Sequence, residues 1–278
     1  MNCMKISKGG YVFRYVLFIL LLLFLCFPLY WTISTSFRET AEIQKTSVSL
    51  IQQTFTLEHY KEALTGANLV NSIKNSLIVT LGTVAITIVV GFLMGYAFAK
   101  LIFKGKKTMN FLILLTQFIP MVAYIIPLYL IMSQLHLLNS LYCLLITYIG
   151  CAFPMAVVLL TNYIKDVPES LEEAAKIDGC NAIQAMFKIV FPLAKSGIVS
   201  TAIFVFITIW QEYLVAVSFI TKGDYRTVSV ALKTFVHQNG TDWGGLMAGA
   251  VLISIPAVIL FMFSRDSFAD NIAGGVKG

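Results

Sequence analysis

The chain has 278 residues, of which 58% are apolar and only 12% are charged, with a formal net charge of +6. A soluble domain carries roughly twice that charged fraction, so a bilayer is the expected surrounding of most of this chain. The basic residues lie in short clusters at the edges of apolar runs, which argues against a nucleic-acid-binding stripe. The five cysteines include no C-x-x-C pair, so neither a disulfide framework nor a cysteine zinc site is predicted.

The spacing of charged residues predicts six membrane-spanning helices. About 20 apolar residues are needed to cross the hydrocarbon layer. Four stretches between charges each hold one such run, and one of them has Glu212 as its only charge. The stretch from Lys107 to Lys165 holds two runs, joined by a polar hairpin at 133–140. The predicted spans are 14–35, 75–100, 110–132, 141–163, 197–220 and 245–263.

The first run resembles a signal peptide in one respect, because Lys5, Lys8 and Arg14 precede it. Its apolar stretch is too long and no A-x-A site follows, so we interpret it as a retained span. With the N-terminus inside, most lysines and arginines fall on the inner side, which predicts that both termini are cytoplasmic. The expected fold is an all-α integral membrane protein with six transmembrane helices, N-in and C-in.

Two features indicate that these helices pack into a bundle. Gly91 and Gly95 form a G-x-x-x-G pattern, which allows close helix approach but is common by chance in apolar helices. Prolines within spans bend helices where neighbours or water restore the lost hydrogen bonds. Such bends either surround a pathway or are ordinary kinks in a rigid bundle. The prolines are Pro120, Pro127, Pro154 and Pro256.

The segment 164–195 is a polar cytoplasmic loop with strong helix signals. Pro168 suits a first helical turn, and the acidic residues that follow it stabilise the positive end of the helix dipole. Gly179 can adopt a positive φ and end this helix. Asn181 and Gln184 have the spacing of a capping box that starts a second helix. The loop is therefore predicted to be two short helices in an L, with the turn at Gly179.

Each of the two short helices has a predicted apolar face. In the first helix, Leu171, Ala174 and Ala175 share a face. The second helix ends at Pro192, and its apolar positions recur at helical spacing: Ile183, Met186, Phe187 and Val190. One interpretation is an amphipathic hairpin on the membrane surface. The small Ala174 and Ala175 favour a docking surface instead, because they let another protein approach the backbone.

The same loop resembles a known sequence element. At fixed offsets it has Glu173, Ala174, Ala175, Gly179, Ile189, Phe191 and Pro192, and this pattern is similar to the EAA loop of ABC-importer permeases. Phe191 stands where that family usually has Leu. The wider stretch 168–179 resembles the carbohydrate-uptake (MalG-like) branch of the family.

Other segments extend the resemblance over essentially the whole chain. The run Trp210, Gln211, Glu212 and Tyr213 is similar to the W-N-E-F element of the fifth span in that branch. Residues 242–256 resemble its sixth span, and residues 274–278 resemble its C-terminal end. The chain departs from the pattern at 265–270, which lacks the expected aromatic residues, and at Ser196, where the branch usually has Pro.

The resemblance implies a domain organisation and a set of partners. Residues 1–71 would hold the first span and an outer loop, 72–264 the type I ABC importer transmembrane domain, and 265–278 a cytoplasmic tail. Residues 104–108 lack the glycine needed for a phosphate-binding P-loop, so this chain is not expected to hydrolyse ATP or to bind a cofactor. ATP would be hydrolysed by a dimeric ATPase partner. A second similar permease and an extracytoplasmic solute-binding protein complete the assembly in a bacterial cytoplasmic membrane.

The resemblance also assigns roles to residues. In the coupling loop, Glu173 and Asp178 would make polar contacts with the ATPase and Gly179 would set the turn. Trp210 and Gln211 are candidates for the substrate pathway together with Glu212. An ionisable residue within a span is a functional candidate by default. Glu212 could face the pathway, pair with the partner permease or reach the outer interface.

The outer loop at 221–244 would face the solute-binding protein. Its side chains that suit sugar hydroxyls, although they are common in any solvated loop, are Tyr225, His237, Gln238, Asn239 and Trp243. His136 and His237 lack metal-ligand spacing, so no metal site is predicted.

Three alternatives remain open on sequence grounds. An ABC permease for a solute other than a sugar would share all the features above. A self-sufficient carrier or channel should show a chain of intramembrane ionisable residues or an inverted repeat. An intramembrane enzyme would need a nucleophile–base or metal constellation inside the spans, and paired His and carboxylate residues are not found there.

Overall fold

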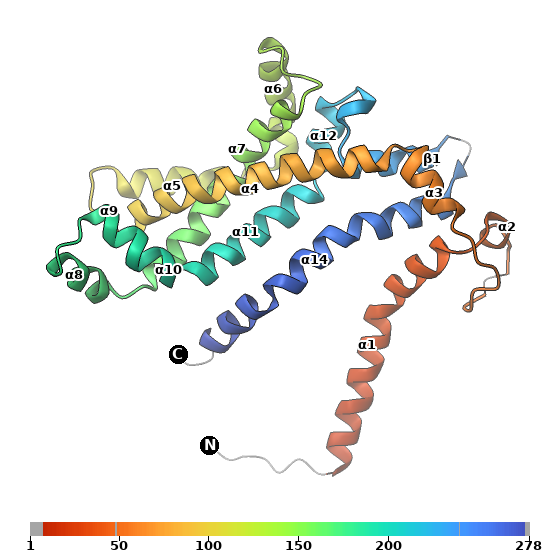
Figure 1. Ribbon diagram of the computed structural model, residues 1–278, viewed down its shortest axis with the longest axis horizontal. Helices are drawn as coiled ribbons and strands as arrows, with labels where there is room; N and C mark the ends of the chain where they lie inside the picture. Colours follow the sequence, from red (N-terminus) through yellow and green to blue (C-terminus); the bar gives the residue numbers. More distant parts are fainter. Residues whose placement is uncertain (1–7, 48, 239, 276–278) are drawn as a thin grey trace. The chain divides into compact units, whose positions relative to one another are not determined.

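The computed structural model describes residues 8–47, 49–238 and 240–275 (Figure 1). These residues form two compact units. The first unit comprises residues 1–69 and 232–254, and the second comprises residues 70–231 and 255–278. The last helix, α14 (Trp243–Gly275), begins in the first unit and continues well past the start of the predicted tail at 265–278, whose last three residues lie outside the described part.

The first unit begins with a long apolar helix, α1 (Lys8–Ser36). Its side chains from Tyr11 to Tyr30 are all exposed, as expected of a helix that is apolar on every side and is surrounded by lipid. The rest of the unit consists of short elements and the start of α14: α2 (Thr40–Ile43), α3 (Glu58–Thr65), η3 (Leu232–Phe235), β1 (Val236–His237) and β2 (Gly240–Thr241). The two strands pair in antiparallel register.

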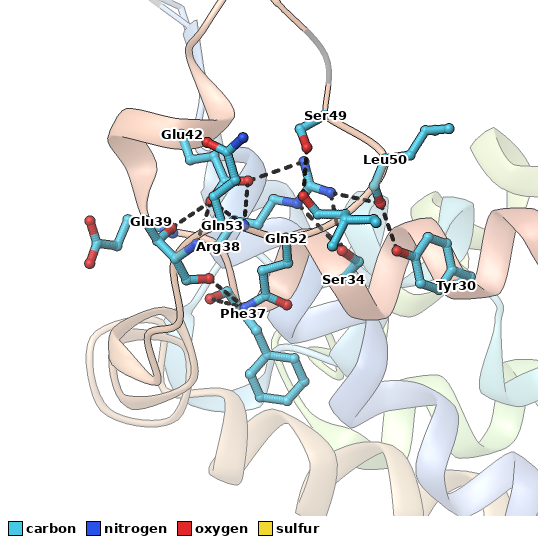
Figure 2. A network of polar contacts seen from close by, with 12 residues as sticks. Tyr30, Ser34, Phe37, Arg38, Glu39, Glu42, Ser49, Leu50, Gln52 and Gln53 are labelled. Carbon is cyan, nitrogen blue, oxygen red and sulfur yellow. Dashed lines mark hydrogen bonds and ion pairs between the residues drawn. The ribbon is translucent and has the colours of Figure 1, made fainter.

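A buried polar network folds the segment after α1 back onto the end of that helix (Figure 2). Arg38 and Glu42 form an ion pair at 3.5 Å. The Arg38 guanidinium lies 4.9 Å from the centre of the Trp31 ring and donates to the carbonyl of Leu50 at 3.4 Å. Glu42 accepts hydrogen bonds from the backbone N–H and the hydroxyl of Thr54, at 2.9 Å and 2.6 Å. Both charges are thus paired, which buried charges require.

The second unit is a helical bundle. Its long helices are α4 (Leu69–Lys100), whose first residue belongs to the first unit, α7 (Leu141–Lys165) and α11 (Lys195–Trp210). Its shorter elements are α5 (Lys106–Thr116), α6 (Met121–Gln134), α8 (Glu169–Ile177), α9 (Ala182–Ala185), the π-helix η1 (Met186–Val190), α10 (Phe191–Leu193), α12 (Leu214–Phe219), η2 (Gly223–Tyr225) and α13 (Val228–Ala231). One buried apolar cluster joins α4, α6, α7, α11 and α12, and another joins α4, α7, η1 and α11.

The six predicted spans are present if two bent pairs of helices each count as one span. Four helices among the described residues are long and apolar enough to cross a membrane, and they contain the first, second, fourth and sixth predicted spans. The third span, 110–132, is divided into α5 and α6, which meet at 97°. The fifth span, 197–220, is α11 and α12 with a break at 211–213, and α11 is bent by 74° from the segment Ala182–Leu193 before it.

The third and fifth spans are thus each divided into shorter helices, and one division coincides with a proline that was predicted to bend its span. Pro120 is the N-cap of α6 and stands at the 97° bend, where it cannot donate a backbone hydrogen bond to the preceding turn. In contrast, Pro127, Pro154 and Pro256 lie inside continuous helices. Of the four prolines, Pro120 is thus the one at a break between helices.

The G-x-x-x-G pattern packs α4 against α7, as predicted. A Cβ at Gly95 would lie 3.1 Å from the backbone nitrogen of Thr161 and 3.2 Å from Leu160 Cβ. A Cβ at Gly91 would lie 3.2 Å from the end of the Leu160 side chain. The two helices approach so closely because neither glycine has a side chain.

Candidate functional site

The cytoplasmic loop forms the two short helices that the sequence predicts. Helix α8 begins after Pro168 and is followed by Gly179, whose φ is +91°. Asn181 accepts a hydrogen bond from the Gln184 backbone N–H at 2.8 Å, and the Gln184 side chain accepts one from the Asn181 N–H at 3.0 Å. This reciprocal capping box starts α9. The prediction of two short helices with a turn at Gly179 is confirmed.

The prediction that Leu171, Ala174 and Ala175 share one face of α8 is wrong. Ala175 is only 6% exposed and shares its buried face with Glu172, which is 4% exposed. Leu171 and Ala174 are exposed, and Ile177 at the end of the helix is 86% exposed. Ala175 therefore supports the fold of the loop, whereas Ala174 is on the surface that another protein can reach.

The second helix of the loop also differs from the predicted pattern. Met186 and Val190 are buried as expected, but Ile183 and Phe187 are exposed. Phe187 lies in the π-helix Met186–Val190, which turns its side chains by a different angle per residue than an α-helix, whereas Ile183 lies in α9 before it. The helix ends at Leu193, one residue past Pro192.

Polar contacts attach the loop to the end of α4. The Tyr96 hydroxyl donates to Glu172 Oε1 at 2.6 Å, and both side chains are buried. Lys176, whose side chain is 49% exposed, forms an ion pair with the same oxygen at 3.2 Å. Lys100 Nζ donates to the backbone carbonyl of Val167 at 2.6 Å, just before α8. A hydrogen bond to a buried carboxylate is stronger than a neutral one, so Glu172 is a firm attachment point.

Aromatic contacts attach the second helix of the loop to the same helix, α4. The ring of Phe92 lies 5.4 Å from Phe191 in an edge-to-face arrangement and 6.4 Å from Phe187. Phe92 and Tyr96 are one turn apart, and Lys100 follows at the same spacing. The sequence analysis missed these three residues, although their i, i+4, i+8 spacing at the inner end of the second span is the signal that could have identified them.

The residues predicted to contact an ATPase do not form one exposed surface. Glu173, Ala174, Asp178 and Gly179 are exposed around the turn, and Pro192 is exposed further along the chain. Ile189 is half-buried, and Ala175 is buried. The surface near the turn thus combines carboxylates with a small residue and the apolar side chain of Ile177.

The fifth span is interrupted where the W-N-E-F-like element lies, and Glu212 stabilises the interruption. Its carboxylate accepts hydrogen bonds from the backbone N–H groups of Val215 and Ala216, at 2.8 Å and 3.2 Å. The Tyr148 hydroxyl on α7 also donates to it, at 2.6 Å. Glu212 therefore satisfies N–H groups at the start of α12 that would otherwise lack partners.

The other two pathway candidates are placed differently. Trp210 is buried and stacks on Phe206, with ring centres 5.5 Å apart. Gln211 is exposed. A separate cavity of about 640 Å³ lies beside the α5–α6 bend and α7, and its polar lining includes Gln117, Tyr124 and Thr147. A cavity of this size with few polar groups can hold a small polar solute.

In the outer loop, Tyr225 and Trp243 are exposed, as are His237 and Gln238. Asn239 lies outside the described residues. Tyr225 belongs to the second unit and the other three belong to the first, so the candidate sugar-contact residues are divided between the two units.

Comparison with known proteins identifies the family of the chain. The family described as binding-protein-dependent transport system inner membrane component matches residues 87–275. The diacetylchitobiose uptake system permease protein DasC of Streptomyces coelicolor is 33% identical over 99% of this chain and 100% of that protein. The trehalose transport system permease protein SugB of Mycobacterium tuberculosis is 32% identical over 90% of this chain and 92% of that protein.

A solved structure shows the same fold. A chain of a bacterial ABC transporter involved in the import of the acidic polysaccharide alginate matches with a TM-score of 0.80 and 23% identity, covering 94% of this chain and 98% of that chain. Permeases of ABC importers are transport components partnered with ATPase subunits and are not enzymes. The chain belongs to the binding-protein-dependent transport system inner membrane component family and is a multi-pass membrane permease of the ABC importers.

Proposed function

We propose that this chain lines, together with a second similar permease, a pathway for a sugar or oligosaccharide delivered by an extracytoplasmic binding protein. The relatives named for diacetylchitobiose and trehalose support a carbohydrate substrate, because each is similar over at least 90% of this chain. The transport domain would occupy 72–264. Gln211 is the pathway candidate whose side chain is free to reach solute, since Trp210 is buried and Glu212 caps α12.

The loop 168–192 would couple this permease to its ATPase. The observation that carries this proposal is the division of α8 into two sides: Glu172 is bonded to Tyr96 on α4, whereas Glu173 and Ala174 are exposed. A force applied to the exposed side would reach α4 through Glu172 and through the Phe92 contacts. The two states of the permease must differ in their contacts with the ATPase for this coupling to work.

A crosslinking experiment tests the coupling proposal. In a chain with Cys180→Ser, a cysteine introduced at Ala174 should form a crosslink with the ATPase subunit of the assembled transporter. The matched control is a cysteine at Ala175, which is adjacent in sequence but buried, and we expect little crosslinking there. Equal capture from both positions, or capture from neither, would contradict the assignment of the exposed side.

Uptake by the reconstituted transporter tests the substrate class. Vesicles containing this chain, its partner permease, the ATPase and the binding protein should accumulate a labelled disaccharide or longer oligosaccharide when ATP is supplied. Accumulation of an amino acid or an inorganic ion in place of every sugar in a broad panel would reject the sugar proposal. The importer assignment would remain unchanged by that result.

A further inference from the structure

Three side chains that can bind a metal ion converge within the first unit. His59 and Glu62 are on α3, and Asp242 immediately precedes α14. One ring nitrogen of His59 and one carboxylate oxygen from each of the other two lie within 4.8 Å of one another. His59 and Asp242 are far apart in the sequence, so the folded chain brings them together.

The His59 ring is fixed in place by burial, by a hydrogen bond and by packing. The side chain is only 4% exposed, and its Nε2 lies 2.9 Å from the backbone carbonyl of Arg38. A carbonyl can only accept, so Nε2 carries the proton and Nδ1 of the neutral ring keeps a lone pair. The same ring packs on Gly244, where a Cβ would lie 2.2 Å from it. Histidines that bind a metal through one ring nitrogen typically donate a hydrogen bond to a carbonyl from the other ring nitrogen.

The Nδ1 atom of His59 is buried and has no hydrogen-bond partner within the part of the chain that the structure describes. A buried polar atom without a hydrogen-bond partner is energetically unfavourable. A cation coordinated by this nitrogen would remove that cost. The orphaned nitrogen is thus an observation independent of the clustering of the carboxylates.

The two carboxylates complete a mixed nitrogen and oxygen donor set. Glu62 is exposed and Asp242 is half-buried. Asp242 Oδ1 accepts a hydrogen bond from the Gly245 N–H at 3.0 Å, and its lone pairs allow it to bind a cation as well. Neither carboxylate forms an ion pair with a lysine or arginine among the described residues.

The cluster borders an open cavity of about 680 Å³, whose other lining residues include Thr40, His237 and Thr241. This space can admit water molecules as further ligands. In the predicted topology, α3 and the residues before α14 are on the outer side of the membrane, so an ion would enter from the extracytoplasmic space.

We propose that His59 Nδ1, Glu62 and Asp242 bind a divalent cation of the zinc class. An imidazole ligand favours such a cation over calcium or magnesium, which prefer sites made only of oxygen. Ligand atoms at about 2.1 Å from one ion lie at most about 4.2 Å apart, so a rotation of the exposed Glu62 side chain can close the site. The bound ion would link α3 to the start of α14. The sequence analysis missed this site because it examined His136 and His237 and not His59.

Metal binding to the full chain tests the proposal. Protein purified in detergent with a tag that contains no histidine is stripped with EDTA, and Zn²⁺ is titrated in competition with a fluorescent chelator. The variants are His59→Gln, which retains a donor for the Arg38 carbonyl, Glu62→Gln, and Asp242→Asn, which retains the helix cap. His136→Asn, in an exposed turn outside the cluster, is the control.

We expect about one Zn²⁺ per chain, and each variant of the cluster should weaken binding by at least about tenfold. Binding by His136→Asn should be unchanged, and Zn²⁺ should raise the melting temperature of wild type but not of Glu62→Gln. The proposal is overturned if wild type binds no stoichiometric Zn²⁺, or if Glu62→Gln and Asp242→Asn both bind as wild type. Tighter binding of Ca²⁺ than Zn²⁺ would overturn the zinc-class assignment.

Discussion

The carboxylate of Glu42 shows how one residue determines the conformation of the outer segment. The hydrogen bond from the Thr54 hydroxyl holds the pKa of Glu42 below its ordinary value of 4.5, although burial opposes this effect. The backbone N–H groups of Gln53 and Thr54 and the Arg38 guanidinium lower the pKa further. Because the folded pKa is lower than the unfolded one, Glu42 stabilises the fold at pH values above 4.5.

The lowered pKa of Glu42 predicts that acid destabilises the protein. As the pH falls from about 4.5 through the folded pKa, the contribution of Glu42 is lost and the melting temperature should decrease. Glu42→Gln should destabilise the protein by about 1–3 kcal/mol at pH 7 and should have a flatter acid profile than wild type. Tryptophan fluorescence can follow the transition, since Trp31 lies beside Arg38. Parallel acid profiles for the two proteins would exclude this role of Glu42.

The hydrogen bonds of the Glu212 carboxylate predict a contribution to the stability of the protein. Glu212→Ala leaves the N–H groups of Val215 and Ala216 without their acceptor, so it should lower stability by about 1–2 kcal/mol. Tyr148→Phe removes one donor and leaves the cap in place, so its effect should be smaller. Thermal unfolding in detergent checks both variants. If Glu212→Ala unfolds at the wild-type temperature but does not transport, the carboxylate acts on the solute and the cap is unimportant.

At the scale of elements, the sequence predicted what depends on local chemistry. Gly179 and the pair Asn181 and Gln184 were identified because a positive φ and a capping box are properties of neighbouring residues. The burial of Ala175 was not predictable, since it follows from the contact of Glu172 with Tyr96 on a distant helix. The π-helix and the break at 211–213 were missed because hydropathy gives the length of an apolar run but not its direction, whereas the bend at Pro120 follows from a local property of proline.

The residue tolerated at the turn between α8 and α9 should be limited by the backbone conformation of Gly179 and not by the space around it. A Cβ at Gly179 would have nothing within 4 Å, yet φ is +91°. The left-handed backbone conformation costs an L-residue about 1–2 kcal/mol, and the cost is lower for Asn than for Ala or Val. Uptake should therefore decrease in the order Gly179→Asn, Gly179→Ala and Gly179→Val, with normal amounts of protein in the membrane. Equal uptake by all three would show that the turn does not matter for coupling.

The attachment of the loop to α4 can be tested with two variants that affect the same carboxylate. Tyr96→Phe removes a buried hydroxyl that donates to Glu172, whereas Lys176→Gln removes a half-exposed ammonium group from the same carboxylate. Tyr96→Phe should lower the ratio of solute transported to ATP hydrolysed, and Lys176→Gln should leave it near wild type. The ratio is measured in vesicles containing the complete transporter. A normal ratio in Tyr96→Phe would show that force reaches α4 by another route, such as the Phe92 contacts.

At the scale of the whole molecule, the distribution of charge argues that the energy for transport comes from another subunit. Glu212 is the one acidic residue in the predicted spans, and its carboxylate is engaged by α12 and Tyr148. A proton- or ion-driven carrier needs a chain of ionisable groups along its pathway. Every acidic residue of the loop 164–195 lies instead outside the predicted spans, where a soluble subunit can approach the loop.

The chain reconstituted alone into vesicles should therefore transport no solute, whether or not a proton or sodium gradient is imposed. Transport should appear when the partner permease, the ATPase and the binding protein are added with ATP, and an ionophore that collapses the gradients should not abolish it. Omission of the ATPase from the complete mixture is the matched control. Gradient-driven uptake by the chain alone would identify a self-sufficient carrier, because no coupling loop is needed when the driving ion binds within the spans.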